Sequence, residues 1–178
     1  MRYVIVCVIK GEAGRFNNEM RRDIFKKFNA KSSKLPAHFT IKAPFEYEGS
    51  IKDLEEEVYK FCNNEEKSPF VMDRYNHFDD RVIFMDVNMS KEGKEVHDRL
   101  IDLLDSFEYI KFNKKDGKNK KFHVTLTSKK VPPMFDKLWN YVNQYTFNFN
   151  CYFDNVSIFK WEDKTWKLHR EFKIGNKN

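Results

Sequence analysis

Two histidines in this sequence stand in the same local pattern, in the tetrapeptides HFTI (38–41) and HVTL (123–126). Polar and apolar residues alternate in both, as is typical of a strand with one buried face. His38 and Thr40 therefore share one face of the first strand, and His123 and Thr125 share one face of the second. The apolar faces must turn toward the core, so we expect the His–Thr faces to meet across a cleft.

This pairing of residue types suits the cleavage of a phosphodiester. Two imidazoles with ordinary pKa values of about 6.5 can act at neutral pH as a base and an acid. Two hydroxyls can hold the non-bridging phosphate oxygens as negative charge grows on them. The chemistry needs no metal or other cofactor, and no residues with metal-ligand spacing lie near either motif. His38 and His123 are thus the candidate catalytic residues, and Thr40 and Thr125 the candidate substrate-binding residues.

Other basic and imidazole groups carry weaker signals. Lys42 lies in phase with His38 and is a further candidate for binding the substrate phosphate. The segment 111–121 contains six lysines and is either a basic flap over the cleft or a solvated loop. The remaining histidines have no partner motif; His77 is interpreted as a loop residue, His97 as a helix-surface residue and His169 as a strand residue.

Helices and strands are expected to alternate along the chain without a long linker. In the first half, the apolar spacing predicts strands and helices: a strand at 3–9, a helix at 16–29, a strand at 38–43 that ends at Pro44, a helix capped by Ser50, and strands at 70–75 and 81–87. The second half predicts a helix capped by Ser90, a strand at 123–127, a turn at 132–133, a helix through 135–142, and strands at 146–153, 156–161 and 165–174.

These two halves form an internal repeat. Each contains a His-Thr strand followed by a helix and further strands. The dipeptide Phe78-Asp79 also recurs, as Phe153-Asp154, with an Ile-Phe pair at the same spacing after it. We therefore expect a single domain over residues 1–178, with repeat lobes at about 10–88 and 90–161.

Composition narrows the class of protein. With 40% hydrophobic residues the chain can bury a core, and no stretch approaches the about 20 apolar residues of a membrane span. Three cysteines, at positions without metal-ligand spacing, argue against a disulfide framework and indicate a reducing, cytoplasmic compartment. The net charge of +6 and the pI of about 9.1 favour anionic partners such as nucleotides or RNA, although an AT-rich coding bias would produce a similar composition.

The duplicated His-apolar-Thr-apolar motifs, in a basic chain of this length, resemble the two-histidine (2H) phosphoesterase superfamily. The first motif and its flanks, LPAHFTIKAPF (35–45), are similar to the small bacterial members of its RNA 2′,5′-ligase and 2′,3′-cyclic phosphodiesterase branch. The resemblance implies a bilobal α+β fold, a pseudo-twofold duplicate in which two antiparallel sheets line a central cleft with helices outside. It also implies that His38 and His123 are the acid/base pair. The exit of the second motif, TSKK (127–130), departs from the apolar exit of some branches.

We therefore expect a metal-independent phosphodiesterase that hydrolyses a 2′,3′-cyclic nucleotide, a related cyclic phosphodiester or an RNA end. The alternatives are an RNA 2′,5′-ligase or 2′,5′-phosphodiesterase, and a non-catalytic RNA- or nucleotide-binding module. Which histidine is the base stays open at this point. No membrane partner is expected, and the internal repeat favours a monomer.

Overall fold

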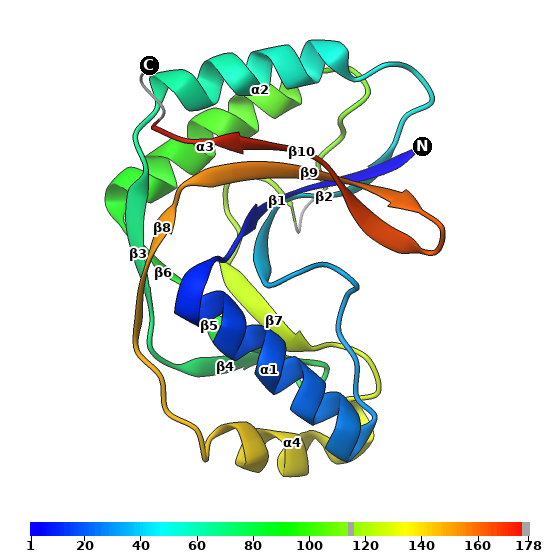
Figure 1. Ribbon diagram of the computed structural model, residues 1–178, viewed down its shortest axis with the longest axis vertical. Helices are drawn as coiled ribbons and strands as arrows, with labels where there is room; N and C mark the ends of the chain where they lie inside the picture. Colours follow the sequence, from blue (N-terminus) through cyan, green and yellow to red (C-terminus); the bar gives the residue numbers. More distant parts are fainter. Residues whose placement is uncertain (114–115, 176–178) are drawn as a thin grey trace.

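The computed structural model describes residues 1–113 and 116–175 of the 178-residue chain. Its helices and strands follow one another in mixed order (Figure 1). They are β1 (Arg2–Val8), α1 (Gly11–Phe28), β2 (His38–Glu46), α2 (Lys52–Asn64), β3 (Ser68–Met72), β4 (Tyr75–Phe78), β5 (Val82–Asp86), β6 (Asn88–Met89), α3 (Lys91–Asp105), β7 (His123–Thr127), the 3-10 turn η1 (Pro132–Met134), α4 (Phe135–Val142), β8 (Phe149–Phe153), β9 (Asn155–Glu162) and β10 (Thr165–Lys173).

The strands form antiparallel sheets in two lobes, so the predicted α+β class is confirmed. One lobe contains the sheet β10-β9-β1-β2 with α2 and α3 beside it, and the other contains β4-β5-β7 with α1 and α4 (Figure 1). A third, smaller sheet, β6-β3-β8, was not predicted and pairs a strand of each sequence half along one side of the molecule. The predicted pseudo-twofold relation and the lobe boundaries at 10–88 and 90–161 stay predictions.

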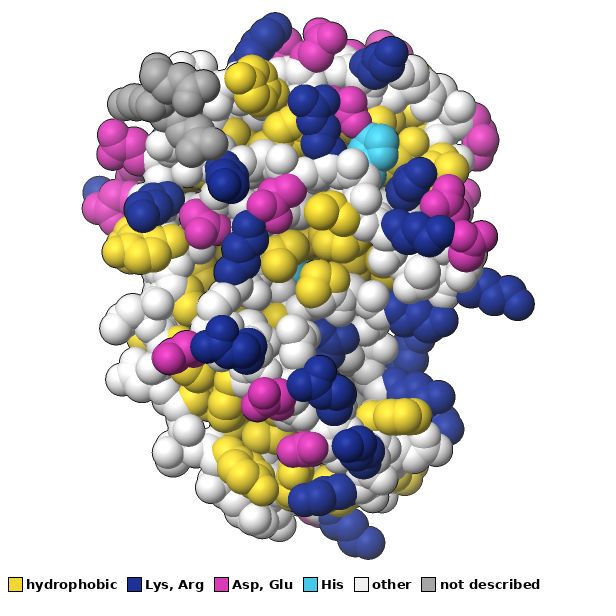
Figure 2. Space-filling model, in the orientation of Figure 1, with side chains coloured by type: hydrophobic (Ala, Val, Ile, Leu, Met, Phe, Trp, Pro, Cys, Tyr) yellow, Lys and Arg dark blue, Asp and Glu magenta, His cyan; other side chains and the backbone are white. Residues whose placement is uncertain are grey.

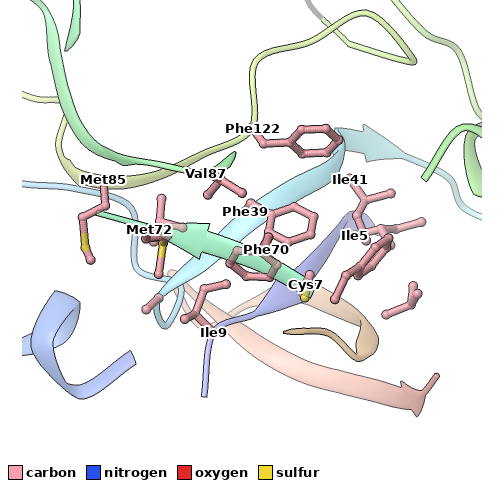
Figure 3. Packing of buried hydrophobic residues seen from close by; sticks show 14 of the residues in the cluster. Ile5, Cys7, Ile9, Phe39, Ile41, Phe70, Met72, Met85, Val87 and Phe122 are labelled. Carbon is pink, nitrogen blue, oxygen red and sulfur yellow. The ribbon is translucent and has the colours of Figure 1, made fainter. Parts of the chain in front are cut away.

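The continuous apolar run at the start of the chain becomes a central strand. β1 lies between β9 and β2, so both of its edges are hydrogen-bonded to neighbouring strands. Ile5 and Cys7 point into the main core with Phe39 (Figure 3), whereas Val4 and Val6 pack into a smaller cluster on the other face. Burial on both faces explains why this strand lacks polar alternation.

Several element boundaries differ from those predicted. α1 begins at Gly11, five residues before the predicted start. Its first turn contains two glycines and only one small apolar residue, Ala13, so the helical pattern is weak there. A side chain at Gly14 would place a Cβ 2.2 Å from the Ile9 carbonyl oxygen, so the close approach of the chain there requires glycine. β2 continues past Pro44 to Glu46; because β2 is an edge strand and shifts register near this position, the missing N–H of Pro44 breaks no ladder.

Helix α3 begins at the predicted cap, but its histidine lies in the core and not on the surface. Ser90 caps the helix as predicted, since its hydroxyl accepts a hydrogen bond from the Gly93 N–H at 3.1 Å. His97, however, is completely buried rather than on the helix surface, with its ring at 4.8 Å from that of Phe122. Burial lowers its pKa to about 3, so His97 is a neutral core residue.

None of the described helices is both long and apolar enough to cross a membrane.

Candidate active site

The two motif strands show the alternation that the sequence predicts. In β2, Phe39 and Ile41 are buried while His38 and Thr40 remain partly exposed. In β7 the same order recurs: the two apolar residues are buried, and His123 and Thr125 are partly exposed. Each strand therefore anchors one face in the core and presents its polar pair on the other.

β2 and β7 belong to different sheets but lie in contact with each other. The positive charge on protonated His123 also contributes to lowering the pKa of His38. The structure thus brings together two histidines that are 85 residues apart in the sequence.

Hydrogen bonds orient both imidazoles in the same way. Nδ1 of His38 lies 2.7 Å from the carbonyl oxygen of Pro36, and Nδ1 of His123 lies 2.9 Å from that of Lys121. A carbonyl oxygen can only accept, so Nδ1 carries the proton in each ring. In the neutral form, Nε2 is then the nitrogen that can take up a proton in both residues.

The surroundings of the two histidines differ in charge. Burial, together with the nearby guanidinium of Arg21 and against the hydrogen bond to Pro36, lowers the pKa of His38 to about 4. Burial also lowers the pKa of His123, together with Lys120 and Lys121. Only His123 has a carboxylate, that of Asp86 on β5, among the groups that favour its protonated form. The carboxylate of Asp86 therefore distinguishes the two rings.

Two aromatic rings pack against the imidazole of His123. The ring of Phe78 meets the imidazole edge-on with centroids 5.0 Å apart, and Phe84 lies at 5.1 Å. These contacts restrict the imidazole to one orientation. Phe78 belongs to β4, a strand that the sequence did not predict.

Helix α1 supports both motifs from one side. The Asn18 side-chain oxygen accepts from the Ala37 N–H at 3.3 Å, next to His38, and Arg21 donates to the carbonyl oxygen of Leu35 at 2.9 Å. The buried Asn17 amide donates to the Thr125 carbonyl oxygen at 3.3 Å. Polar side chains of α1 therefore hydrogen-bond both to the residues just before the first motif and to the backbone of the second motif.

A cleft of about 880 Å³ opens beside these strands. Thr40 and His123 line it, whereas His38 and Thr125 are not among its lining residues. Further lining side chains are aromatic or charged, and they come from β4, the turn after it and the segment before β7: His77, Phe78, Asp79, Arg81, Asp116, Lys120 and Lys121. The cleft thus offers both stacking rings and cations.

The structure does not place Lys42, the further candidate for binding a substrate phosphate, in the cleft. Its Nζ lies 2.6 Å from the Asp116 carboxylate, and both side chains are only 3% exposed. The segment before β7 folds against β2 and brings Asp116 onto this lysine, so the charge of Lys42 is neutralised inside the protein. No sequence pattern linked these two residues.

Lys120 is the cation that the sequence did not single out. It lines the cleft, and its Nζ donates to the carbonyl oxygen of Ile41 on β2. Burial lowers its pKa to about 8. In the sequence, Lys120 differs from a surface lysine only by its position three residues before His123. The other lysines of the segment 111–121 made this position hard to recognise as a candidate site residue.

The lysine-rich segment 111–121 contributes to the cleft wall. Residues 114 and 115 of this segment lie outside the described residues. The described parts form no helix or strand, and Asp116, Lys120 and Lys121 line the cleft.

Among the described residues, no group of three or more His, Cys, Asp or Glu is arranged to hold a metal ion.

Comparisons with known proteins point to one family. A family model described as the 2′-5′ RNA ligase superfamily matches residues 12–165. A provisionally named phosphoesterase of Geobacillus sp. (strain WCH70) is 21% identical over 183 residues, covering 99% of this chain and 98% of the relative.

Solved structures share the fold over almost the whole chain. TT0787 of Thermus thermophilus matches with a TM-score of 0.67 at 13% identity, covering 99% of this chain and 100% of the other. E. coli LigT in its apo form matches with a TM-score of 0.55 at 9% identity and 98% coverage of both chains. At these identities the likeness concerns the fold.

Proposed function

The chain belongs to the 2′-5′ RNA ligase superfamily and is a phosphoesterase, and on that basis we propose that it hydrolyses a 2′,3′-cyclic phosphate on a nucleotide or an RNA end. One observation carries the proposal. Two imidazoles with matching Nδ1 hydrogen bonds lie on neighbouring strands, each with a threonine two residues along, beside a cleft. This is the set of groups that in-line displacement at phosphorus requires.

In the proposed reaction, one imidazole takes a proton from water at Nε2 as the water oxygen attacks phosphorus. The other imidazole donates its Nε2 proton to the departing ribose oxygen, so the cyclic ester opens to a phosphomonoester and the ring protons balance. Thr40 and Thr125 donate hydrogen bonds to the non-bridging oxygens. Lys120 adds positive charge at the cleft wall, where the phosphate would lie.

The electrostatic surroundings of the two imidazoles support different roles for them. His38, whose pKa is lowered to about 4 and which lies near Arg21, is neutral at neutral pH and suits the base. His123 has the Asp86 carboxylate to favour its protonated form and suits the acid. We therefore propose His38 as the base and His123 as the acid.

A nucleotide substrate is supported by what a fold relative binds. E. coli LigT has been crystallised with 3′-AMP, NADP⁺, ATP and phosphate. The cleft of this chain contains the rings of His77 and Phe78, on which a base can stack, next to His123.

The direct test is turnover of the four nucleoside 2′,3′-cyclic phosphates in the presence of EDTA, with the products identified as 2′- or 3′-phosphates. We expect hydrolysis that EDTA does not reduce. No turnover of any of them, or of an oligonucleotide with a 2′,3′-cyclic end, would overturn the proposal. Turnover of 2′,5′-linked RNA in their place would establish the 2′,5′-phosphodiesterase alternative. Joining of RNA ends by the same protein would identify a ligase.

The dependence of kcat/KM on pH is expected to be bell-shaped and to have an acidic optimum. The base His38 must be neutral, so activity rises as the pH passes its pKa of about 4. The acid His123 must be protonated, so activity falls as the pH passes its pKa, which is lowered from about 6.5. In the kcat profile both limbs should move to higher pH, because the bound phosphate anion favours both imidazolium forms. A flat or rising kcat/KM between about pH 5 and 9 would contradict the paired-histidine mechanism.

A cytoplasmic location and a monomeric state complete the proposal. Cys7 and Cys62 are buried free thiols. Free thiols are the usual state of cysteine in a reducing compartment. The cleft is formed by elements of one chain, so a monomer suffices for the chemistry described.

A further inference from the structure

A second hollow of about 550 Å³ lies beside the active site, along α1 and the segment that joins α1 to β2. Half of its lining side chains are lysines or arginines. The lining residues are Asn18, Arg21, Arg22, Phe25, Ala30, Lys31, Ser32, Lys34, Leu35 and Lys129, here called the basic groove. In Figure 2, Lys and Arg side chains run down the right-hand edge of the molecule, over the place where Figure 1 shows this segment.

The cations of the basic groove are not neutralised by carboxylates of the described residues. Arg21 donates to the Ser32 hydroxyl and to the carbonyl oxygens of Ser33 and Leu35. Lys34 donates to another carbonyl oxygen, at 2.7 Å. These acceptors carry no charge, so the positive potential of the groove remains available to an anionic ligand.

Elsewhere the protein pairs many of its basic side chains. Lys10, Lys118 and Lys167 each lie within 3.1 Å of a carboxylate, and Arg99 forms two hydrogen bonds with Glu65. The basic groove differs from these surfaces because it gathers five cations and no acidic residue in one hollow. A basic composition alone does not produce such a separation of charge.

The groove also contains an exposed aromatic ring. The side chain of Phe25 is 48% exposed, and Nζ of Lys31 lies 5.3 Å from its ring centroid. A solvent-exposed ring next to cations is the combination with which proteins hold single-stranded nucleic acid, since bases stack on the ring and phosphates meet the cations. An acidic peptide would use the cations but not this ring.

The basic groove adjoins the cleft through neighbouring residues. Ser128 lines the cleft and Lys129 lines the groove. The backbone of Lys129 is hydrogen-bonded to that of Lys31, so the exit of β7 is tied to the approach to β2. Arg21 lines the groove and also lowers the pKa of His38. A chain lying in the groove can therefore continue toward the two histidines.

We propose that the basic groove binds the phosphate backbone of single-stranded RNA whose terminal phosphodiester lies in the cleft. The inference rests on the proposed function and narrows its substrate from a nucleotide or an RNA end to an RNA end. The cleft holds the reacting nucleotide, and the groove holds the nucleotides that precede it. The groove contacts phosphates and stacks a base, so it confers affinity without strong sequence preference.

Binding is tested first, without any requirement for turnover. The probe is a fluorescein-labelled oligouridylate with an ordinary 3′-hydroxyl end, followed by anisotropy over a range of salt concentrations. Wild type is compared with the triple variant K31Q/K34Q/K129Q and with the matched control K52Q/K67Q/K173Q. The control removes the same charge from exposed lysines on α2, the segment after it and β10.

We expect the groove variant to bind at least about tenfold more weakly, and its slope of log K against log salt to be shallower by about 2, at about 0.7 per lost phosphate contact on a single strand. The control should follow wild type. Phe25→Ala should weaken binding by roughly tenfold through lost stacking, with a salt slope close to that of wild type. Equal weakening in the groove variant and the control would show that only net charge matters and would overturn the proposal.

Kinetics then separates this inference from the proposed function. For wild type, kcat/KM should be higher for an oligonucleotide with a 2′,3′-cyclic end than for the matching cyclic mononucleotide. The ratio of the two should fall about tenfold in the groove variant and stay unchanged in the control. Mononucleotide turnover with a ratio near one in wild type would refute the groove and leave the proposed function standing. Groove-dependent binding without turnover of either substrate would refute the function and leave the groove standing.

Discussion

Replacing either His38 or His123 by alanine is expected to lower kcat for 2′,3′-cyclic phosphate hydrolysis by about 10²–10⁴-fold. Each variant removes one of the two proton transfers at phosphorus, and general acid or base catalysis contributes that factor. The substitutions change partly exposed side chains on the polar faces of β2 and β7, so folding should be preserved. The measurement is steady-state turnover in EDTA, with thermal unfolding recorded for each variant.

The double variant and a control make this result specific. Groups that act as a unit give non-additive losses, so the variant lacking both histidines should be only slightly slower than the slower single variant. His169→Gln alters an imidazole that contacts Glu55 on the surface, and it should keep the kcat of wild type. If either alanine variant retained full kcat, the two-histidine mechanism would have to be abandoned.

Removing the hydroxyl of Thr40 or Thr125 is expected to lower kcat by about 10²–10³-fold. Valine keeps the shape of threonine, so Thr40→Val and Thr125→Val delete a hydrogen-bond donor with little change of volume. A donor aimed at the charge that develops in the transition state contributes this factor, and less of it appears in ground-state binding. We therefore expect kcat to fall more than KM rises, as measured on a cyclic mononucleotide.

Thr127 supplies the matched control on the same strand. Its hydroxyl is buried and donates to the Lys31 carbonyl oxygen at 3.1 Å, outside the cleft lining. Thr127→Val should lower the free energy of unfolding by about 1 kcal/mol, since it deletes a buried hydrogen bond, while kcat falls far less than in the other two variants. Similar losses of kcat in all three would show that the hydroxyls stabilise the strands and do not hold the phosphate.

The strands that carry the motifs were predictable because their signal is local. Alternation with period two placed His38 and Thr40 opposite Phe39 and Ile41, and burial follows that order. A cap such as Ser90 is equally local, since the bond that it makes spans three residues. By contrast, β4 is a short strand whose residues are partly or fully exposed, so it has no buried face to mark it in the sequence.

The sequence is least informative about residues whose environment is built by distant segments. Nothing near His97 in the sequence indicates that Phe122 covers it. Lys42 looked like a phosphate ligand because its strand phase was correct, but its partner Asp116 is 74 residues away. The strand phase determines the face on which a side chain lies, and only tertiary packing determines what covers that face.

The sequence by itself determined the chemistry available to this protein: two imidazoles and two hydroxyls on alternating strands, duplicated in one chain. These properties follow from residue type and from the period of a strand, which need no knowledge of distant contacts. The tertiary structure decided that the two strands meet, that Arg21 and Asp86 give the two histidines different electrostatic surroundings, and that unneutralised cations form a groove beside them. Those outcomes depend on which segments pack together, because electrostatic interactions depend on distance in space and not along the chain.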